Sequence, residues 1–170
     1  MHIQGKRVLI TEGGTGIGLA LAQALARKGA RLVLSGRRPA PLTTAVAELK
    51  ANGTEAYAVA ADVATNAGRS TMLSAARDHL GGLDILVNNA GGVRAGRLET
   101  TTEDDIQTMV DVDLLAPILL TRAALPELRR SGQGLIVNVT SGGALIGMPF
   151  YATYVATKAE LARFGEALKR

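Results

Sequence analysis

The sequence predicts an α/β protein with a doubly wound parallel sheet and helices on both faces. Apolar runs of strand length alternate with helical patterns along the whole chain, which is typical of successive βαβ units. The apolar runs are continuous, as expected for parallel strands that are buried on both faces. A composition of 47% hydrophobic but only 3% aromatic residues suits such a sheet. We expect residues 1–170 to form a single domain with one core.

Local signals define the first two strand–helix pairs. An apolar run predicts a strand at Arg7–Thr11, and apolar residues at helical spacing then predict a helix at Gly16–Lys28. Gly29 is expected to end this helix, because glycine readily adopts the left-handed conformation that follows helices. The next apolar run predicts a strand at Arg31–Ser35, which is followed by a helix at Pro41–Ala51.

The remaining elements continue the alternation, and the parallel strands are expected to be joined by right-handed crossovers. Proline lacks the N–H that a helix interior needs, so Pro117 is expected to interrupt the long fourth helical segment. No internal repeat, low-complexity tract or linker divides the chain. These elements are strands at Glu55–Val59, Leu83–Val87 and Leu135–Thr140, and helical segments at Asn66–Leu80, Thr102–Leu128 and Pro149–Lys169.

Composition argues against several classes of function. The chain has no cysteine, and its two histidines, His2 and His79, lack ligand spacing, so we expect no metal site. The formal net charge of +4 is spread along the chain without aromatic interleaving, so we expect no nucleic-acid partner. No apolar run approaches membrane-spanning length and no signal-peptide core opens the chain. We therefore expect no membrane partner and a cytoplasmic location.

A glycine-rich turn joins the first strand to the first helix. Glycines let a backbone approach a pyrophosphate closely, and a helix N-terminus offers free N–H groups and a positive dipole end. This strand–turn–helix context is the one that a phosphate-binding turn requires, although a glycine-rich loop can also be only a tight connection. The candidate binding residues are Thr11, Gly13, Gly14, Thr15, Gly16, Ile17 and Gly18.

Two arginines, Arg37 and Arg38, follow the second strand. In dinucleotide-binding proteins an acidic residue at this place binds the ribose 2′-hydroxyl of NAD. Guanidinium groups instead suit the 2′-phosphate of NADP, because they bind phosphate through paired hydrogen bonds. The arginines therefore predict NADP(H) in preference to NAD(H), the alternative being two surface arginines without a ligand.

The most informative side chains lie near the end of the chain. Tyr154 precedes Lys158 by one helical turn, so both lie on one helix face. Ser141 comes directly after the fifth strand. Another tyrosine, Tyr151, has Val155 one turn later and is not the candidate. Together with the glycine-rich turn, these residues indicate nicotinamide-dependent redox chemistry on a carbonyl or an alcohol.

Over essentially its whole length the chain resembles the short-chain dehydrogenase/reductase family. The turn from Thr11 to Gly18 resembles the family's Thr-Gly-x-x-x-Gly-x-Gly, and Ser141, Tyr154 and Lys158 match its catalytic serine and Tyr-x-x-x-Lys. The resemblance implies a Rossmann-type sheet with strand order 3-2-1-4-5. Through the family's Asp-Val and Asn-Asn-Ala-Gly motifs, it also implies cofactor contacts from Asp62, Val63, Asn89, Ala90 and Gly91.

The family's mechanism, carried over to these positions, makes Tyr154 the general acid/base. Its phenol would donate a proton to the substrate carbonyl oxygen as hydride arrives, or remove that proton in the reverse direction. A free phenol has a pKa of about 10, and the Lys158 ammonium would lower it by stabilising the phenolate. Lys158 and Tyr154 would also contact the cofactor, and Ser141 would hydrogen-bond the substrate oxygen.

Two residues depart from the family's pattern. Glu12 replaces the first glycine of the turn, where a side chain crowds the backbone and a carboxylate repels phosphate. Asp113 stands where many members carry a catalytic asparagine, which helps to hold a water near the lysine. As a catalytic residue, Asp113 either holds the same water or raises the pKa values of the lysine and the tyrosine. The alternative is a surface aspartate in a long helix.

A third departure from the family's pattern is the end of the chain at Arg170. Family members normally continue with further strands and a substrate-covering loop, so we expect a longer polypeptide in preference to a natural short form. Without such a continuation, the fifth strand is expected to be an exposed apolar edge.

The leading hypothesis is an NADP(H)-dependent oxidoreductase acting on a small-molecule carbonyl or alcohol. The alternative is a cofactor-binding or oligomerising module without turnover, in which Glu12, Asp113 and the missing elements prevent catalysis. A sugar-nucleotide epimerase fits the glycine spacing less well. Family members commonly pair through the long fourth helix and the last helix, so a homodimer or homotetramer is expected.

Overall fold

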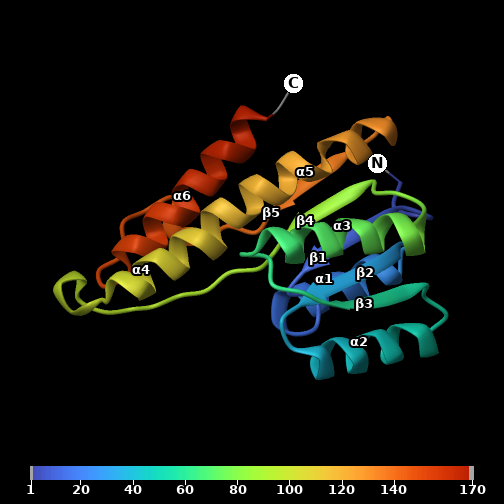
Figure 1. Ribbon diagram of the computed structural model, residues 1–170, viewed down its shortest axis with the longest axis horizontal. Coiled ribbons are helices and arrows are strands. Elements are labelled where there is room, and N and C mark those ends of the chain that lie inside the picture. The colour runs from blue at the N-terminus through green and yellow to red at the C-terminus, as the bar shows by residue number, and fades with distance from the viewer. Residues whose placement is uncertain (1, 169–170) are drawn as a thin grey trace.

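The computed structural model describes residues 2–168, which form a five-stranded parallel sheet (Figure 1). The strand order is β3-β2-β1-β4-β5, which confirms the expected order and the doubly wound topology. Because β5 is at one end of this order, the expected edge strand is also confirmed. The strands are β1 (Arg7–Thr11), β2 (Arg31–Gly36), β3 (Ala56–Ala60), β4 (Ile85–Asn88) and β5 (Leu135–Asn138).

Helices cover both faces of the sheet, and α4 and α6 run side by side beyond its edge (Figure 1). Successive strand residues point to opposite faces, so Leu9 and Leu86 pack with α3 and α5, whereas Ile10 and Val87 pack with α1 and α2. The helices are α1 (Gly16–Ala26), α2 (Pro39–Ala51), α3 (Asn66–Leu80), α4 (Glu103–Val110), α5 (Ala116–Arg130) and α6 (Ala152–Ala167).

Several element boundaries differ from the sequence prediction by a few residues. Strand β4 begins at Ile85, later than the expected Leu83, and follows Gly81 and Gly82, whose φ angles are 77° and 140°. Helix α6 begins after Phe150, whose φ of 68° is incompatible with a right-handed helix. The end that was expected for this helix, Lys169, lies outside the described residues.

The long fourth helical segment is interrupted about one turn before Pro117, where the interruption was expected. A π-helical turn, Asp111–Leu115, joins α4 to α5, and the N–H of Ala116 donates to the carbonyl of Asp111. Pro117 then falls in the first turn of α5, where the absence of its N–H costs little. Such turns widen a helix locally and often mark functional sites, and this one carries Asp113.

One largely buried ion pair ties the start of β1 to the start of β4. The Arg7 guanidinium donates to both carboxylate oxygens of Asp84, with Nε–Oδ2 at 2.9 Å and Nη2–Oδ1 at 2.7 Å. The backbone N–H of Arg7 donates to Oδ2 at 2.8 Å, and Nη1 donates to the Gly81 carbonyl at 2.8 Å. The pair therefore holds two central strands in register at the end of the sheet opposite the glycine-rich turn.

Candidate active site

The glycine-rich turn is folded tightly against the start of α1. A Cβ on Gly18 would lie 2.7 Å from Nδ2 of Asn89 and would clash with the carbonyl of Glu12, so this position requires glycine. Thr15 is the N-cap residue of α1. The helix therefore begins directly after the turn, and its first N–H groups have no intrahelical partner.

Thr11 fastens the turn to the loop that follows β4. Its Oγ1 accepts hydrogen bonds from the N–H groups of Asn89 and Ala90, both at 2.9 Å, and donates to the Val87 carbonyl at 3.3 Å. The side-chain amide of Asn89 donates in return to the Thr11 carbonyl at 2.9 Å. Because Thr11 is buried and occupied by these bonds, we expect Thr11 and Asn89 to act on a cofactor indirectly, by positioning the two loops.

Two cavities open at the carboxyl ends of the strands, and they share part of their lining. One, of about 380 Å³, lies between the glycine-rich turn and the start of α2. The other, of about 170 Å³, lies between the loops that follow β3 and β4. Ile17 belongs to neither lining and is exposed. The predicted binding residues that line one cavity or both are Thr11, Gly14, Thr15, Arg37, Arg38, Asp62, Val63, Ala90 and Gly91.

Glu12 adopts a left-handed backbone conformation, with a φ of 52°. Glycine reaches this region freely, whereas another residue pays about 1–2 kcal/mol. The backbone at Glu12 is therefore strained, whereas the crowding by its side chain that the sequence suggested stays a prediction. Glu12 and Arg37 line both cavities and Arg38 lines the larger one, so a phosphate bound in the larger cavity would meet one acidic and two basic side chains.

A residue that the sequence analysis missed supports the Asp62–Val63 segment. Arg69 of α3 is buried, and its Nη1 donates to the carbonyls of Val63 and Ala64, each at 2.8 Å. Asp62 Oδ1 accepts the N–H of Ala64 at 2.9 Å. In the sequence Arg69 is indistinguishable from a solvated helix residue, and only its packing reveals that it positions this turn.

Lys158 and Asp113 form a buried ion pair. Lys158 is 4% exposed and Asp113 is 0% exposed, so the interpretation of Asp113 as a surface residue is wrong. Lys158 Nζ lies 3.5 Å from Asp113 Oδ1 and donates to the Val139 carbonyl at 3.3 Å. Oδ1 also accepts the Gly92 N–H at 2.8 Å, while Oδ2 has no hydrogen-bond partner among the described residues. Burial raises the pKa of the Asp113 carboxyl, and Lys158 opposes only part of that effect.

The loop after β4 packs directly against this pair. A Cβ on Gly91 would lie 2.8 Å from Asp113 Oδ1 and 3.0 Å from Lys158 Nζ. Glycine at this position therefore lets the loop that lines the smaller cavity approach Asp113 and Lys158 closely.

Tyr154 lies on α6 together with Lys158, and Ser141 lies in the segment that follows β5. Tyr154 is half-buried near the start of α6, and the centroid of its ring is 5.9 Å from Lys158 Nζ. The Tyr151 ring packs edge-on to it, with centroids 6.4 Å apart. Ser141 Oγ accepts the N–H of Gly143 at 3.2 Å, a bond that does not use the hydrogen of the hydroxyl.

Among residues 2–168, no three His, Cys, Asp or Glu side chains gather where a metal ion could be held. No helix in the same range combines the length and the apolar character needed to cross a bilayer. His79 instead stacks on Tyr57, with ring centroids 4.3 Å apart.

Comparisons with known proteins agree with this geometry. The family model described as short chain dehydrogenase matches residues 6–170. A short chain dehydrogenase of Pseudocercospora fijiensis is 38% identical over 169 residues, which cover 98% of this chain and 55% of the relative. The 2,5-dichloro-2,5-cyclohexadiene-1,4-diol dehydrogenase LinX of Sphingobium indicum is 37% identical over 161 residues, covering 93% and 63%.

A solved structure shows the same likeness in three dimensions. The short chain dehydrogenase/reductase from Burkholderia phymatum in complex with NAD has a TM-score of 0.95 and 29% identity, covering 99% of this chain and 60% of that chain. The chain thus spans less than two thirds of the length of these three relatives. Because the family match extends over almost all of it, the chain belongs to the short-chain dehydrogenase/reductase family.

Proposed function

We propose that this chain forms the dinucleotide-binding domain of an NADP(H)-dependent oxidoreductase that interconverts a carbonyl and an alcohol. The observation that carries the proposal is the buried ammonium of Lys158, which lies 5.9 Å from the centroid of the Tyr154 ring. A cation near a phenol stabilises the negative charge that the phenol carries when it has given up its proton, as a general acid/base must.

The residues at the carboxyl edge of the sheet fit a dinucleotide. A Cβ on Gly13 or Gly14 would meet its neighbours at 2.9 Å and 3.1 Å, so the backbone here leaves no space for side chains. The turn and the N-terminus of α1 would hold the pyrophosphate, and the Asp62–Val63 segment would contact the adenine. Lys158 would hold the nicotinamide ribose. When bound, the nicotinamide supplies or accepts the hydride.

Tyr154 would hold the proton that the substrate oxygen gains or loses. The ammonium of Lys158 lies near both the Tyr154 ring and the Asp113 carboxylate, so its positive charge acts on both groups. Ser141 would donate a hydrogen bond to the substrate oxygen and stabilise the charge that develops there.

Incubation with NADPH and a panel of carbonyl compounds tests the proposal. Loss of absorbance at the reduced-nicotinamide band, dependent on both protein and carbonyl compound, supports the oxidoreductase. Binding of NADPH without consumption, in the longest form of the protein, supports a module without turnover. The strained Glu12 and the unpartnered Asp113 oxygen are the observations that favour this second function.

Arg37→Asp is expected to weaken NADP(H) binding by about 1–3 kcal/mol, because a charge-assisted bond to the 2′-phosphate is lost. NAD(H) lacks that phosphate, so its affinity should change far less. Isothermal titration of both cofactors measures the difference, and Arg129→Asp on the exposed end of α5 is the matched charge control. Equal affinities of the unmodified protein for both cofactors would contradict the NADP(H) preference.

Glu12→Gly is expected to tighten cofactor binding, because it removes a negative charge beside the phosphate site and relieves the backbone strain at a φ of 52°. Glu12→Gln separates the two effects, since it removes the charge but keeps the side chain. Titration calorimetry on the three proteins is the measurement. If Glu12→Gly binds no better than the parent, the carboxylate points away from the cofactor.

We also propose a homodimer or homotetramer that pairs through α4, α5 and α6. Leu115, in the π-helical turn between α4 and α5, is exposed, and Ile118 and Phe164 are partly exposed. Met109 and Leu161 are buried within the chain, so they are not available for pairing. Light scattering at micromolar concentration should give twice or four times the monomer mass, and a monomer would disprove the pairing. The cytoplasmic location stays a prediction.

A further inference from the structure

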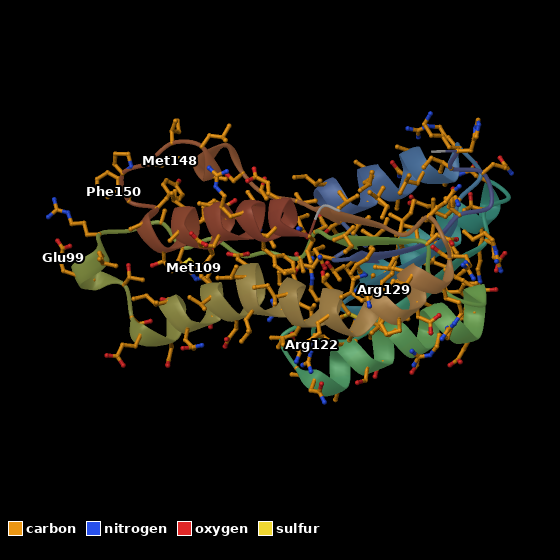
Figure 2. All side chains as sticks on the ribbon, turned by 90° about the horizontal axis from the view of Figure 1, so that it is seen from above. Glu99, Met109, Arg122, Arg129, Met148 and Phe150 are labelled. Atoms are coloured by element: carbon orange, nitrogen blue, oxygen red, sulfur yellow. The ribbon has the colours of Figure 1, made fainter. Side chains whose placement is uncertain are left out.

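The segment between Ser141 and Tyr151 is entirely apolar. Gly142–Phe150 contains no side chain that carries a charge or forms hydrogen bonds, yet much of it lies on the surface. Leu145 is 87% exposed, Ile146 is 67% exposed and Phe150 is 58% exposed. Figure 2 shows Met148 and Phe150 close together on the loop before α6, at one end of the molecule.

A second loop borders this segment. The N–H of Gly96 donates to the Phe150 carbonyl at 2.8 Å, and Val93 and Leu98 in the same loop are also exposed. The charged residues of this loop are already paired, because Arg94 Nε lies 3.3 Å from Asp105 Oδ1 and Arg97 Nη1 lies 3.9 Å from Glu99 Oε1. The two loops therefore present apolar side chains without an unbalanced charge between them. We call Leu145, Ile146, Met148 and Phe150 the apolar shelf.

The apolar shelf approaches Ser141 and the start of α6 at Met148. A Cβ on Gly143 would lie 3.2 Å from Met148 Sδ, 3.1 Å from Val155 Cγ2 and 3.6 Å from Ser141 Oγ. Val155 follows Tyr154 directly in α6, and the backbone N–H of Tyr151 donates to the Met148 carbonyl at 3.2 Å. A molecule whose oxygen reaches Ser141 and Tyr154 would thus contact the apolar shelf at Met148 with the atoms next to that oxygen.

The charges near the reacting oxygen argue against an anionic substrate. The ammonium next to Tyr154 belongs to Lys158, and it already faces the carboxylate of Asp113 at 3.5 Å. A second carboxylate, such as that of an oxo acid, would enter a site where the positive charge is offset and where apolar side chains would strip its water.

We propose that the substrate is an uncharged ketone or secondary alcohol with an apolar chain, and that this chain packs on the apolar shelf. The inference rests on the proposed function of Tyr154 and Ser141, and it adds the chemical class of the substrate to it. Each methylene that the shelf removes from water should strengthen binding, by about fourfold where burial is complete.

Methyl-detected NMR titration tests the proposal without turnover. 2-Octanone is expected to shift the methyl signals of Ile146 and Met148 and to bind at least tenfold more tightly than 2-butanone. 2-Oxooctanoate, which has the same chain length and a carboxylate, is expected to bind at least tenfold more weakly than 2-octanone. Leu145→Ser combined with Ile146→Ser should abolish the dependence on chain length, whereas Leu168→Ser, on an exposed leucine at the far end of α6, should leave it intact.

The outcomes separate this inference from the proposed function. Reduction of short ketones without any gain from a longer chain would overturn the substrate class and leave the oxidoreductase standing. Length-dependent binding without NADPH oxidation would support the apolar shelf and count against turnover. Equal binding of 2-oxooctanoate, or shelf signals that depend on protein concentration and not on the ketone, would overturn the inference, the latter in favour of a second copy of the chain.

Discussion

Replacing Tyr154 with phenylalanine is expected to lower kcat by about 10²–10⁴-fold while leaving cofactor affinity almost unchanged. The substitution removes the proton donor and keeps the ring, whose centroid lies 5.9 Å from Lys158 Nζ. The loss should therefore appear in kcat and in kcat/KM alike, as expected for an interaction made in the transition state. Steady-state NADPH oxidation and a parallel titration of the cofactor measure the two effects.

Tyr151→Phe is the matched control for this experiment. Its ring packs edge-on to Tyr154 at 6.4 Å between centroids, so the control keeps the aromatic contact and removes a hydroxyl from the same helix end. Its kcat should stay within a few-fold of the parent. A fully active Tyr154→Phe protein would end the assignment of Tyr154 as the acid/base.

Asp84→Ala is expected to lower the free energy of unfolding by about 3 kcal/mol. The carboxylate of Asp84 accepts two hydrogen bonds from the Arg7 guanidinium and one from the Arg7 backbone, and its removal leaves these donors without a partner. Urea unfolding followed by circular dichroism measures the change on this chain alone. Glu55→Ala, which breaks the more exposed pair with Arg31, should cost less than about 1 kcal/mol.

The Asp84 contribution should also depend on pH. The hydrogen bonds from Arg7 hold the pKa of the Asp84 carboxyl below its ordinary value of about 4. Because the folded-state pKa is lower than the unfolded one, the stabilisation is complete above the unfolded pKa and is lost as the pH falls through the folded value. The parent and Asp84→Ala curves should therefore converge below about pH 4 and separate above it, and a constant difference would contradict the mechanism.

The sequence predicted the fold well because buried parallel strands and amphipathic helices leave periodic patterns. The pairing of Tyr154 with Lys158 could also be predicted from the sequence, since helical spacing alone places both residues on one helix face. The π-helical turn at Asp111–Leu115 was not predicted, because a shift in the hydrogen-bond partner leaves no mark in hydrophobic periodicity. Pro117 indicated that the helix is irregular nearby. The sequence does not show where the irregular turn lies, because that depends on which backbone carbonyl is left without a donor.

Other features depend on tertiary packing and could not be read in advance. The pattern gave no reason to separate Arg69 from other charged helix residues, although it holds the carbonyls of Val63 and Ala64. Asp113 lies in a segment with several polar residues, and it is buried by the docking of α6 and of the loop that contains Gly91 and Gly92. The left-handed backbone of Phe150, whose carbonyl accepts the N–H of Gly96 from another loop, likewise has no local signal in the sequence.

The buried pair of Asp113 and Lys158 links the evolutionary histories of two positions that are far apart in the sequence. Losing the lysine first would leave a carboxylate isolated in the interior, and losing the aspartate first would leave the ammonium with the Val139 carbonyl as its described neighbour. Each substitution is therefore tolerated differently according to what the other position holds. Descendants of this protein should change Asp113 to asparagine, which keeps the contact with Gly92, far more readily than to an aliphatic residue.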